Sequence, residues 1–254
     1  MELVLELFEK NGLLVAFALV GALTLFAGWL SKTLTNGRLH GSAIAILLGL
    51  VLSYVGGVTT GGEDGLADVA LFSGLAVMGG SMLRDFAIVA TAYGVNLDEI
   101  RRAGLAGGLS VVVGVVASFV VGAAVAMLFG YTDAVSVTTI GAGAATYIVG
   151  PVTGTAVGAT SEVIALSVAA GLVKAVVVMI GTPFMAKAIG LNNPKSAMVF
   201  GGVMGTTSGV AGGLAATDKR LVPYGAMTAT FYTGVGCLLC PSVLFFAVRA
   251  ITGG

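Results

Sequence analysis

The chain has few charged side chains. Only 9% of its 254 residues are charged, whereas an average soluble domain carries about 25%. So few charges cannot cover the surface of a soluble protein of this size, and a hydrophobic content of 57% excludes a disordered chain. The 12 basic and 12 acidic side chains cancel, so the chain lacks the basic stripe that a nucleic-acid-binding protein needs. The composition indicates an all-α integral membrane protein.

Histidine and cysteine are also scarce. The single histidine, His40, excludes a histidine-rich metal site. Cys237 and Cys240 form a C-x-x-C pair, but they lie in a long apolar run without a second pair, so a redox or zinc site is not indicated. The start, MELVLELFEKNG, is acidic rather than basic, so we expect no cleavable signal peptide there.

Glycine, in contrast, is abundant. The chain has 40 glycines, about twice the roughly 7% of average usage. In a membrane, glycine lets helix backbones approach closely and permits breaks where a helix unwinds around a site. The composition therefore favours a transporter or a channel, and a tightly packed structural bundle is the alternative.

Six apolar runs are expected to cross the membrane, for which a helix needs roughly 20 residues. They are residues 13–31, 42–55, 69–82, 105–129, 163–183 and 222–248. Six crossings place all the basic loops between these runs on the same side of the membrane. Because basic loops are enriched on the cytoplasmic side, that side is expected to be the cytoplasm. We divide the chain into an N-terminal scaffold that contacts a partner, residues 1–102, and a transport core, residues 103–254.

Two stretches of the core are too polar for ordinary spanning helices. Residues 133–160 and 197–217 are rich in glycine, threonine and serine, and Pro151 lies within the first. Such stretches suit re-entrant helical hairpins, because a broken helix is tolerated in lipid only where protein or a water-filled cavity covers it. With the basic loops inside, the first hairpin opens to the outside and the second to the cytoplasm.

The two hairpins share a pattern. Residues 150–158 read GPVTGTAVG and residues 205–213 read GTTSGVAGG, so both repeat glycine at every fourth position. Glu162 follows the first and Asp218 follows the second. This parallel is typical of an inverted repeat, in which the site lies where broken half-helices meet. The alternative is that Gly-x-x-x-Gly only packs helices together.

Hairpin tips of this kind suit a small anion. Half-helix N-termini carry a partial positive charge, hydroxyl groups donate to carboxylates, and glycine permits close approach. The candidate substrate-binding residues are Thr153, Gly154 and Thr155 at the first tip, Thr206, Thr207, Ser208 and Gly209 at the second tip, and Lys174. Carbonyl oxygen atoms at the opposite half-helix ends suit Na⁺, and Thr146 and Glu162 are its candidate ligands. We therefore expect a small carboxylate whose transport is coupled to Na⁺ or to H⁺. Glu162 is also compatible with a place at the water interface.

Lys174 lies within the apolar run 163–183. A lysine at the centre of a spanning helix costs roughly 2.5–3.5 kcal/mol, so it is a functional candidate. It either attracts a substrate carboxylate or pairs with an acid such as Glu162. These two residues are 12 positions apart, roughly 18 Å along a helix, so they do not form a catalytic dyad and no enzyme is expected.

Two long segments carry a family resemblance. TYIVGPVTGTAVGATSEVIALSVAAGLVKAVVV (146–178) and NNPKSAMVFGGVMGTTSGVAGGLAATDKRLVPYGAM (192–227) resemble MadM, the large subunit of bacterial two-component malonate:sodium symporters. The resemblance implies Na⁺-coupled malonate uptake across the cytoplasmic (inner) membrane of a bacterium. It also implies a small membrane partner resembling MadL, and it leaves a higher oligomer open.

A weaker resemblance links the chain to the LrgB/CidB membrane family. It covers the SVTT of residues 136–139, the apolar run 163–183 and residues 193–213. The chain departs from that family at Ser208-Gly209, where the family has Ser-His, and at Lys174, where the family is uncharged. This alternative implies another small carboxylate, such as glycolate or glycerate, or a regulatory or pore-forming role.

Overall fold

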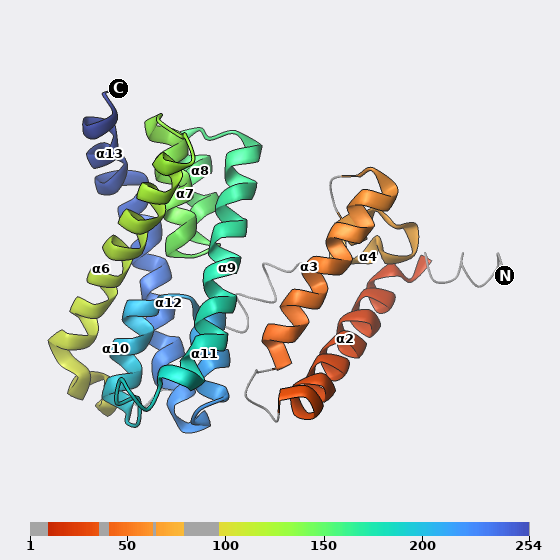
Figure 1. Ribbon diagram of the computed structural model, residues 1–254, viewed down its shortest axis with the longest axis horizontal. Helices are drawn as coiled ribbons and strands as arrows, with labels where there is room; N and C mark the ends of the chain where they lie inside the picture. The colour runs from red at the N-terminus through yellow and green to blue at the C-terminus, as the bar shows by residue number, and fades with distance from the viewer. Residues whose placement is uncertain (1–9, 36–40, 63–64, 79–96, 254) are drawn as a thin grey trace. The chain divides into compact units, whose positions relative to one another are not determined.

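The computed structural model describes residues 10–35, 41–62, 65–78 and 97–253. Within these ranges all regular secondary structure is helical, which confirms the expected all-helical class. The chain divides into two compact units, Met1–Ala90 and Thr91–Gly254, and each is described by itself (Figure 1). The functional division into scaffold and transport core stays a prediction.

The first unit contains two long helices, α2 (Gly12–Thr35) and α3 (Gly41–Thr60). Three short helical segments follow: η1 (Gly65–Asp68), η2 (Ala70–Phe72) and α4 (Gly74–Val77). Among the described residues of this unit, α2 meets the length and apolarity of a membrane span, and α3 contributes the shorter apolar segment Leu47–Thr60. The predicted span 69–82 begins instead with the short segments η2 and α4, and its last residues, 79–82, lie outside the described part.

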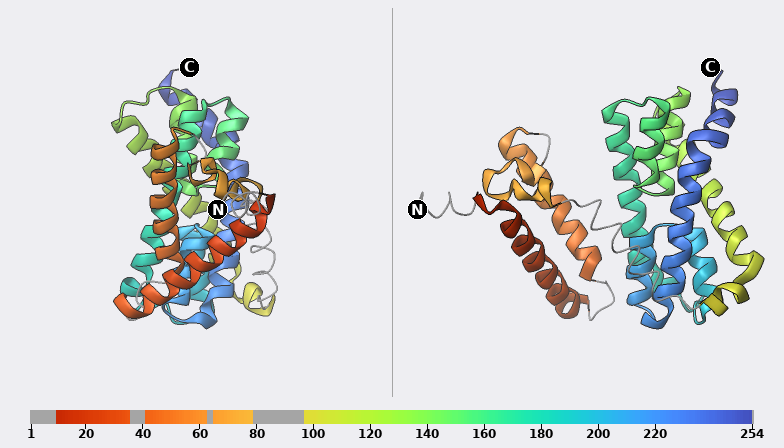
Figure 2. Two further views of the ribbon diagram at one scale, coloured as in Figure 1. Left: turned by 90° about the vertical axis from the view of Figure 1, so that its right-hand side faces the viewer. Right: turned by 180° about the vertical axis from the view of Figure 1, so that it is seen from behind.

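The second unit is a helical bundle, shown from two further sides in Figure 2. Three of its segments qualify as membrane spans: Gly104–Leu128, Ser161–Met185 and Lys219–Thr252. They confirm the predicted runs 105–129, 163–183 and 222–248 as long apolar helices. In order, the elements are α6 (Leu97–Leu128), α7 (Ala134–Ala145), α8 (Val149–Val157), α9 (Ser161–Met185), α10 (Pro194–Met204), α11 (Thr207–Ala215), η3 (Lys219–Leu221), α12 (Val222–Leu239), the π-helical η4 (Cys240–Leu244) and α13 (Phe245–Thr252).

Helices α7 and α8 form an antiparallel pair. A Cβ placed on Gly150 would lie 2.9 Å from the Cα of Gly143, and one placed on Gly154 would lie 2.8 Å from the Cγ2 of Thr139. The residues nearest the break therefore face each other, and so do the residues farther from it. Two helices that pack in this register form a helical hairpin, in which the start of α7 lies beside the end of α8.

Helices α10 and α11 form a second pair, which opens at the start of α12. A Cβ on Gly225 would lie 3.2 Å from the carbonyl oxygen of Ala197 in α10, and it would also meet Leu214 in α11. The outer ends of both helices therefore meet at Gly225. Their inner ends meet two turns further along α12, where Gly205 lies against the ring of Tyr232.

Helix α9 contacts both pairs and shows that the two breaks approach each other. Gly171 lies against the backbone of Tyr147 in the first break, and a Cβ on Gly209, next to the second break, would lie 2.7 Å from the carbonyl oxygen of Ala175. Gly171 and Ala175 are one turn apart, roughly 6 Å along the helix. Both lie near the middle of the 25-residue α9.

The two pairs extend from these breaks in opposite directions along α9. A Cβ on Gly154 would lie 2.7 Å from the Cγ1 of Ile164, near the start of α9, and one on Gly213 would lie 2.6 Å from the Cβ of Thr182, near its end. Figure 1 shows α7 and α8 at the upper end of this unit and α10 and α11 at the lower end. The insertion of either pair into a bilayer as a re-entrant hairpin stays a prediction.

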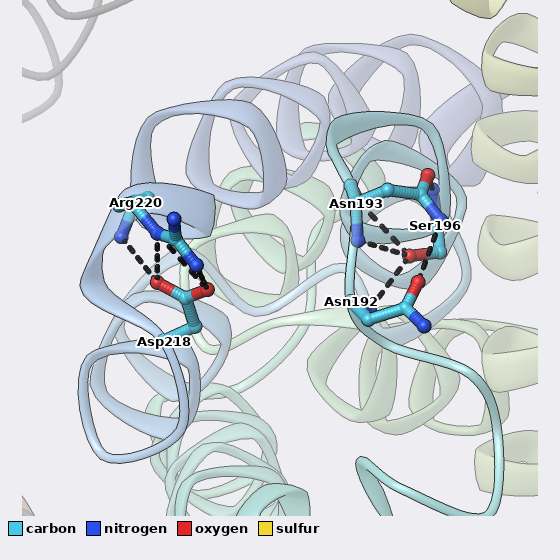
Figure 3. Close-up of polar contacts among 5 residues, drawn as sticks. All are labelled: Asn192, Asn193, Ser196, Asp218 and Arg220. Atoms are coloured by element: carbon cyan, nitrogen blue, oxygen red, sulfur yellow. Dashed lines mark hydrogen bonds and ion pairs between the residues drawn. The ribbon is translucent and has the colours of Figure 1, made fainter.

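Each pair begins with a side-chain cap. Asp133 accepts from the backbone N–H of Ser136 at the start of α7 (2.7 Å), and Asn193 accepts from that of Ser196 at the start of α10 (3.0 Å). Such caps satisfy N–H groups that a helix start leaves open. After α11, Arg220 donates to the carboxylate of Asp218 (2.8 Å), which lowers the pKa of that carboxyl group (Figure 3). The outer ends of the pairs are therefore fixed locally.

The hairpin arrangement predicts which side of a membrane the loops face. In a chain carrying Cys237→Ser and Cys240→Ala, single cysteines at Thr132 and Ser161 should react with an impermeant maleimide from one side. Cysteines at Lys195 and Lys219 should react only from the other side. Labelling of right-side-out and inverted vesicles measures this. If the two members of either couple label from opposite sides, that pair crosses the membrane and is not re-entrant.

Candidate functional site

The first helix break comprises residues 146–148. Thr146 is extended (φ −162°, ψ 150°), and its carbonyl oxygen accepts from the N–H groups of Val149 (2.9 Å) and Gly150 (3.2 Å). Its hydroxyl group accepts from the N–H of Ile148 (3.4 Å). The N–H groups that open α8 are therefore satisfied within the break itself, and this helix start has little left to offer a ligand.

The prediction that the first tip lies at residues 153–155 is wrong. These residues lie inside α8, where Thr153 is buried and Thr155 is exposed. Pro151 suggests a break at this point of the sequence, but it occupies the first turn of α8. A first-turn residue needs no intrahelical N–H bond, so proline is tolerated there and helps the helix to begin.

The second break consists of Gly205 and Thr206. Gly205 ends α10 in the left-handed region (φ 72°), which favours glycine. Thr206 is the extended N-cap of α11, but its side chain makes no capping hydrogen bond. The predicted tip residues 206–209 are thus the N-cap and first turn of a helix that begins inside the bundle. Its uncapped start carries a partial positive charge.

Three consecutive hydroxyl groups at this helix start have no hydrogen-bond partner within the described structure. They are the buried oxygen atoms of Thr206, Thr207 and Ser208. Many other hydroxyl groups in the bundle donate to a carbonyl one turn earlier, as Thr233 does to Ala229 (3.1 Å). An unpaired buried polar group costs about 1–3 kcal/mol, so this cluster is suited to the acceptor atoms of a ligand.

Lys174 lies at the level of both breaks and joins several helices. Its ammonium group donates to Ser118 Oγ in α6 (2.8 Å), to the carbonyl oxygen of Ala145 at the end of α7 (2.8 Å) and to the hydroxyl group of Tyr232 in α12 (3.3 Å). None of these partners is an acid. The alternative of a structural ion pair between Lys174 and Glu162 therefore has no support from these contacts.

Comparison with known protein families identifies one match. The family model of the malonate/sodium symporter MadM subunit matches residues 4–252. The chain belongs to the MadM family. No curated protein and no solved structure matches the chain significantly. A MadM subunit is part of a transporter, which agrees at this coarse level with the expectation that the chain is not an enzyme.

In this MadM-family chain the remaining candidate residues lie away from the two breaks. Glu162 is exposed in the first turn of α9, nine residues before Gly171, which is roughly 13 Å along the helix. One ion therefore cannot touch both Glu162 and Thr146. Gly154 lies beside Ile164, so Thr153 and Gly154 also lie nearer the start of α9 than its middle.

Three further residues of interest carry little signal in the sequence. Ser118 and Tyr232 hold Lys174, and Thr138 is a fully buried threonine in α7 whose hydroxyl group has no partner within the described structure. Thr153 in α8 shares this last property. A tyrosine in the apolar run 222–248 was the available signal for Tyr232, because a buried tyrosine hydroxyl group needs a partner.

The close packing of α9 against the first break predicts a difference between two of its glycines. Gly171→Ala would force a Cβ into the backbone of Tyr147, whereas Gly181 has nothing within 4 Å of its Cβ position. Overpacking costs about 1–3 kcal/mol, so Gly171→Ala should lower the thermal unfolding midpoint in detergent. The control Gly181→Ala should leave it unchanged or raise it. Equal midpoints for the two variants would contradict the close contact.

Proposed function

We propose that the chain is the large subunit of a secondary transporter that couples malonate uptake to Na⁺ across the bacterial cytoplasmic membrane. Its partner is a small membrane subunit resembling MadL. Membership of the MadM family supports this proposal, as do the long apolar helices. The family description names malonate and sodium, and the word subunit in it implies a partner.

The start of α11 is the proposed carboxylate site. The single observation that carries it is the uncapped helix start with three adjacent unpaired hydroxyl groups, those of Thr206, Thr207 and Ser208. Hydroxyl and N–H donors at a helix N-terminus hold a carboxylate well. Gly209 contacts α9 at Ala175, next to Lys174, so a bound anion also lies near a positive charge.

Thr153 and Gly154 serve the approach to the site in this proposal. Gly154 lies beside Ile164, ten residues before Lys174 on α9, which is roughly 15 Å along the helix. A three-carbon diacid is too short to touch both places. The hydroxyl group of Thr153 is buried and unpaired, so it suits a transient contact. Thr155 is exposed and lies at the edge of this approach.

The proposed coupling to Na⁺ also requires a site for this ion. Thr146 and Glu162 stay its candidate ligands, but their separation along α9 means that they serve different positions. Glu162 at the exposed start of α9 suits an entrance, where a carboxylate attracts cations. Thr146 in the first break suits a site between the helices, where main-chain and hydroxyl oxygen atoms are the donors that Na⁺ prefers.

Uptake by the reconstituted protein tests the proposal. Proteoliposomes that contain the chain and its small partner should accumulate labelled malonate against its gradient when Na⁺ is high outside. They should not do so when K⁺ replaces Na⁺. Vesicles with the small partner alone are the control. Uptake that only equilibrates malonate, or that ignores Na⁺, would contradict a Na⁺-coupled transporter.

The carboxylate site is tested by removing one hydroxyl group. Thr207→Val should raise the KM for malonate about tenfold or more, because a hydrogen bond to a charged group contributes about 1.5–3 kcal/mol. The control is Thr230→Val, whose hydroxyl group already donates to Ala226 (2.9 Å), and its KM should stay unchanged. If Thr207→Val transports with the original KM, the start of α11 is not the carboxylate site.

A further inference from the structure

The ammonium group of Lys174 occupies an oxygen cage. An ammonium group has three N–H donors, and all three have an acceptor here: a serine hydroxyl, a main-chain carbonyl and a phenol hydroxyl. The three acceptors belong to α6, α7 and α12, so the cage is built by tertiary packing around the side chain of α9. With its donors engaged in this way, Lys174 has none left for a substrate carboxylate.

The cage has the chemistry of a site for a monovalent cation. Its oxygen atoms are uncharged, and hydroxyl and carbonyl oxygen atoms are ligands that hard cations accept. One of them, the carbonyl oxygen of Ala145, belongs to the last turn of α7. Helix C-termini carry a partial negative charge, so a positive charge is stabilised at this point.

We infer that Lys174 is a built-in cation that holds the first helix break, and that Tyr232 is its positioning residue. The role of Lys174 in transport rests on the proposed function. Within that function, binding of the carboxylate and supply of the positive charge are assigned to different residues. The start of α11 binds the carboxylate by hydrogen bonds. Lys174 acts on the substrate through its charge and through the position of the first break, without touching it.

Tyr232 connects the cation to the second break. Its hydroxyl group accepts from Lys174 and donates to the carbonyl oxygen of Gly114 (3.2 Å). Its ring fills the space that a Cβ on Gly205 would need. A shift of the α10–α11 pair therefore moves the ring, and the ring carries one of the three acceptors of the ammonium group. Tyr232 transmits movement between the two breaks.

The same arrangement bears on the coupling ion. A Na⁺ ion bound at Thr146 would lie one residue from Ala145, whose carbonyl oxygen already accepts from the ammonium group of Lys174. Two like charges at such short range repel each other. This repulsion counts against Thr146 and leaves Glu162, at the exposed start of α9, as the favoured one of the two candidate Na⁺ ligands.

Chemical rescue tests the cation role without any transport assay. Lys174→Ala removes the side chain beyond Cβ, and propylammonium has the size and the charge of the lost part. The thermal unfolding midpoint of the purified variant, without malonate, should be lower than that of the wild type. Propylammonium should restore most of the loss, and 1-propanol, which has a similar shape but no charge, should not. The exposed Lys187→Ala variant should respond to neither compound.

Two results would overturn the cation role. One is a Lys174→Ala midpoint equal to that of the wild type, which shows that the ammonium group does not hold the first break. The other is equal restoration by propylammonium and 1-propanol, which indicates filled space rather than charge. Because this assay needs no malonate, it gives an answer even if the wild-type protein fails to transport malonate.

A second variant tests the positioning role and covers the case in which Lys174→Ala does not fold. Tyr232→Phe keeps the ring against Gly205 and removes only the hydroxyl group. The maximal uptake rate should fall about tenfold, as expected for a lost hydrogen bond to a charged group, while the KM for malonate stays within about twofold of the wild-type value. In a Lys174→Met background the same change should have no further effect. Tyr224→Phe in the same helix is the control.

The opposite pattern would overturn the positioning role. A raised KM with an unchanged maximal rate would make Tyr232 a substrate ligand. Equal effects of Tyr232→Phe with and without Lys174 would show that the two side chains act independently.

Discussion

A helix that ends inside an apolar bundle exposes N–H and carbonyl groups where little water competes for them, so each needs a partner within the protein. The first break meets this need: Thr146 satisfies the start of α8, and Lys174 binds the carbonyl oxygen of Ala145. The second break does not, because α11 starts without a cap and with unpaired hydroxyl groups. In our proposal the first break is therefore held in place by its own hydrogen bonds, and the second break binds the substrate.

The glycine content follows from the same geometry. Both breaks reach the middle of α9 only because the helices around them approach closer than side chains allow, as at Gly171 and Gly209. Gly205 has two roles: its positive φ ends α10, and its lack of a side chain leaves room for the ring of Tyr232. Close approach in turn brings main-chain oxygen atoms within reach of a lysine. The unusual composition and the buried charge are two consequences of one arrangement.

Hydropathy predicted the long helices of the second unit well, because an apolar run of roughly 20 residues has few other ways to satisfy its backbone in lipid. The predicted span 69–82 is not a single helix in its described part, residues 69–78, which forms the short segments η2 and α4. Polarity and glycine spacing located both broken segments. They misplaced the first tip, because the role of Pro151 depends on where α8 begins, and Thr146 decides that through its own backbone.

The surroundings of Lys174 were beyond prediction from sequence. Its partners Ser118, Ala145 and Tyr232 are 56, 29 and 58 residues away along the chain, and no local pattern connects them. The sequence identified the charge as costly, but only packing shows which atoms compensate that cost. Thr138 could not be predicted either, because nothing in the sequence distinguishes it from threonines whose hydroxyl group has a partner.

The unpaired hydroxyl groups at the start of α11 also bear on leakage. Sealing them away from water on both sides with no anion present leaves each one unsolvated, at about 1–3 kcal/mol per group. If the chain works as proposed, a transporter without substrate would therefore bear this cost when the site is closed to both sides, whereas one with bound malonate would not. Three adjacent side chains would in this way favour passage of the occupied carrier over slippage of the unoccupied one.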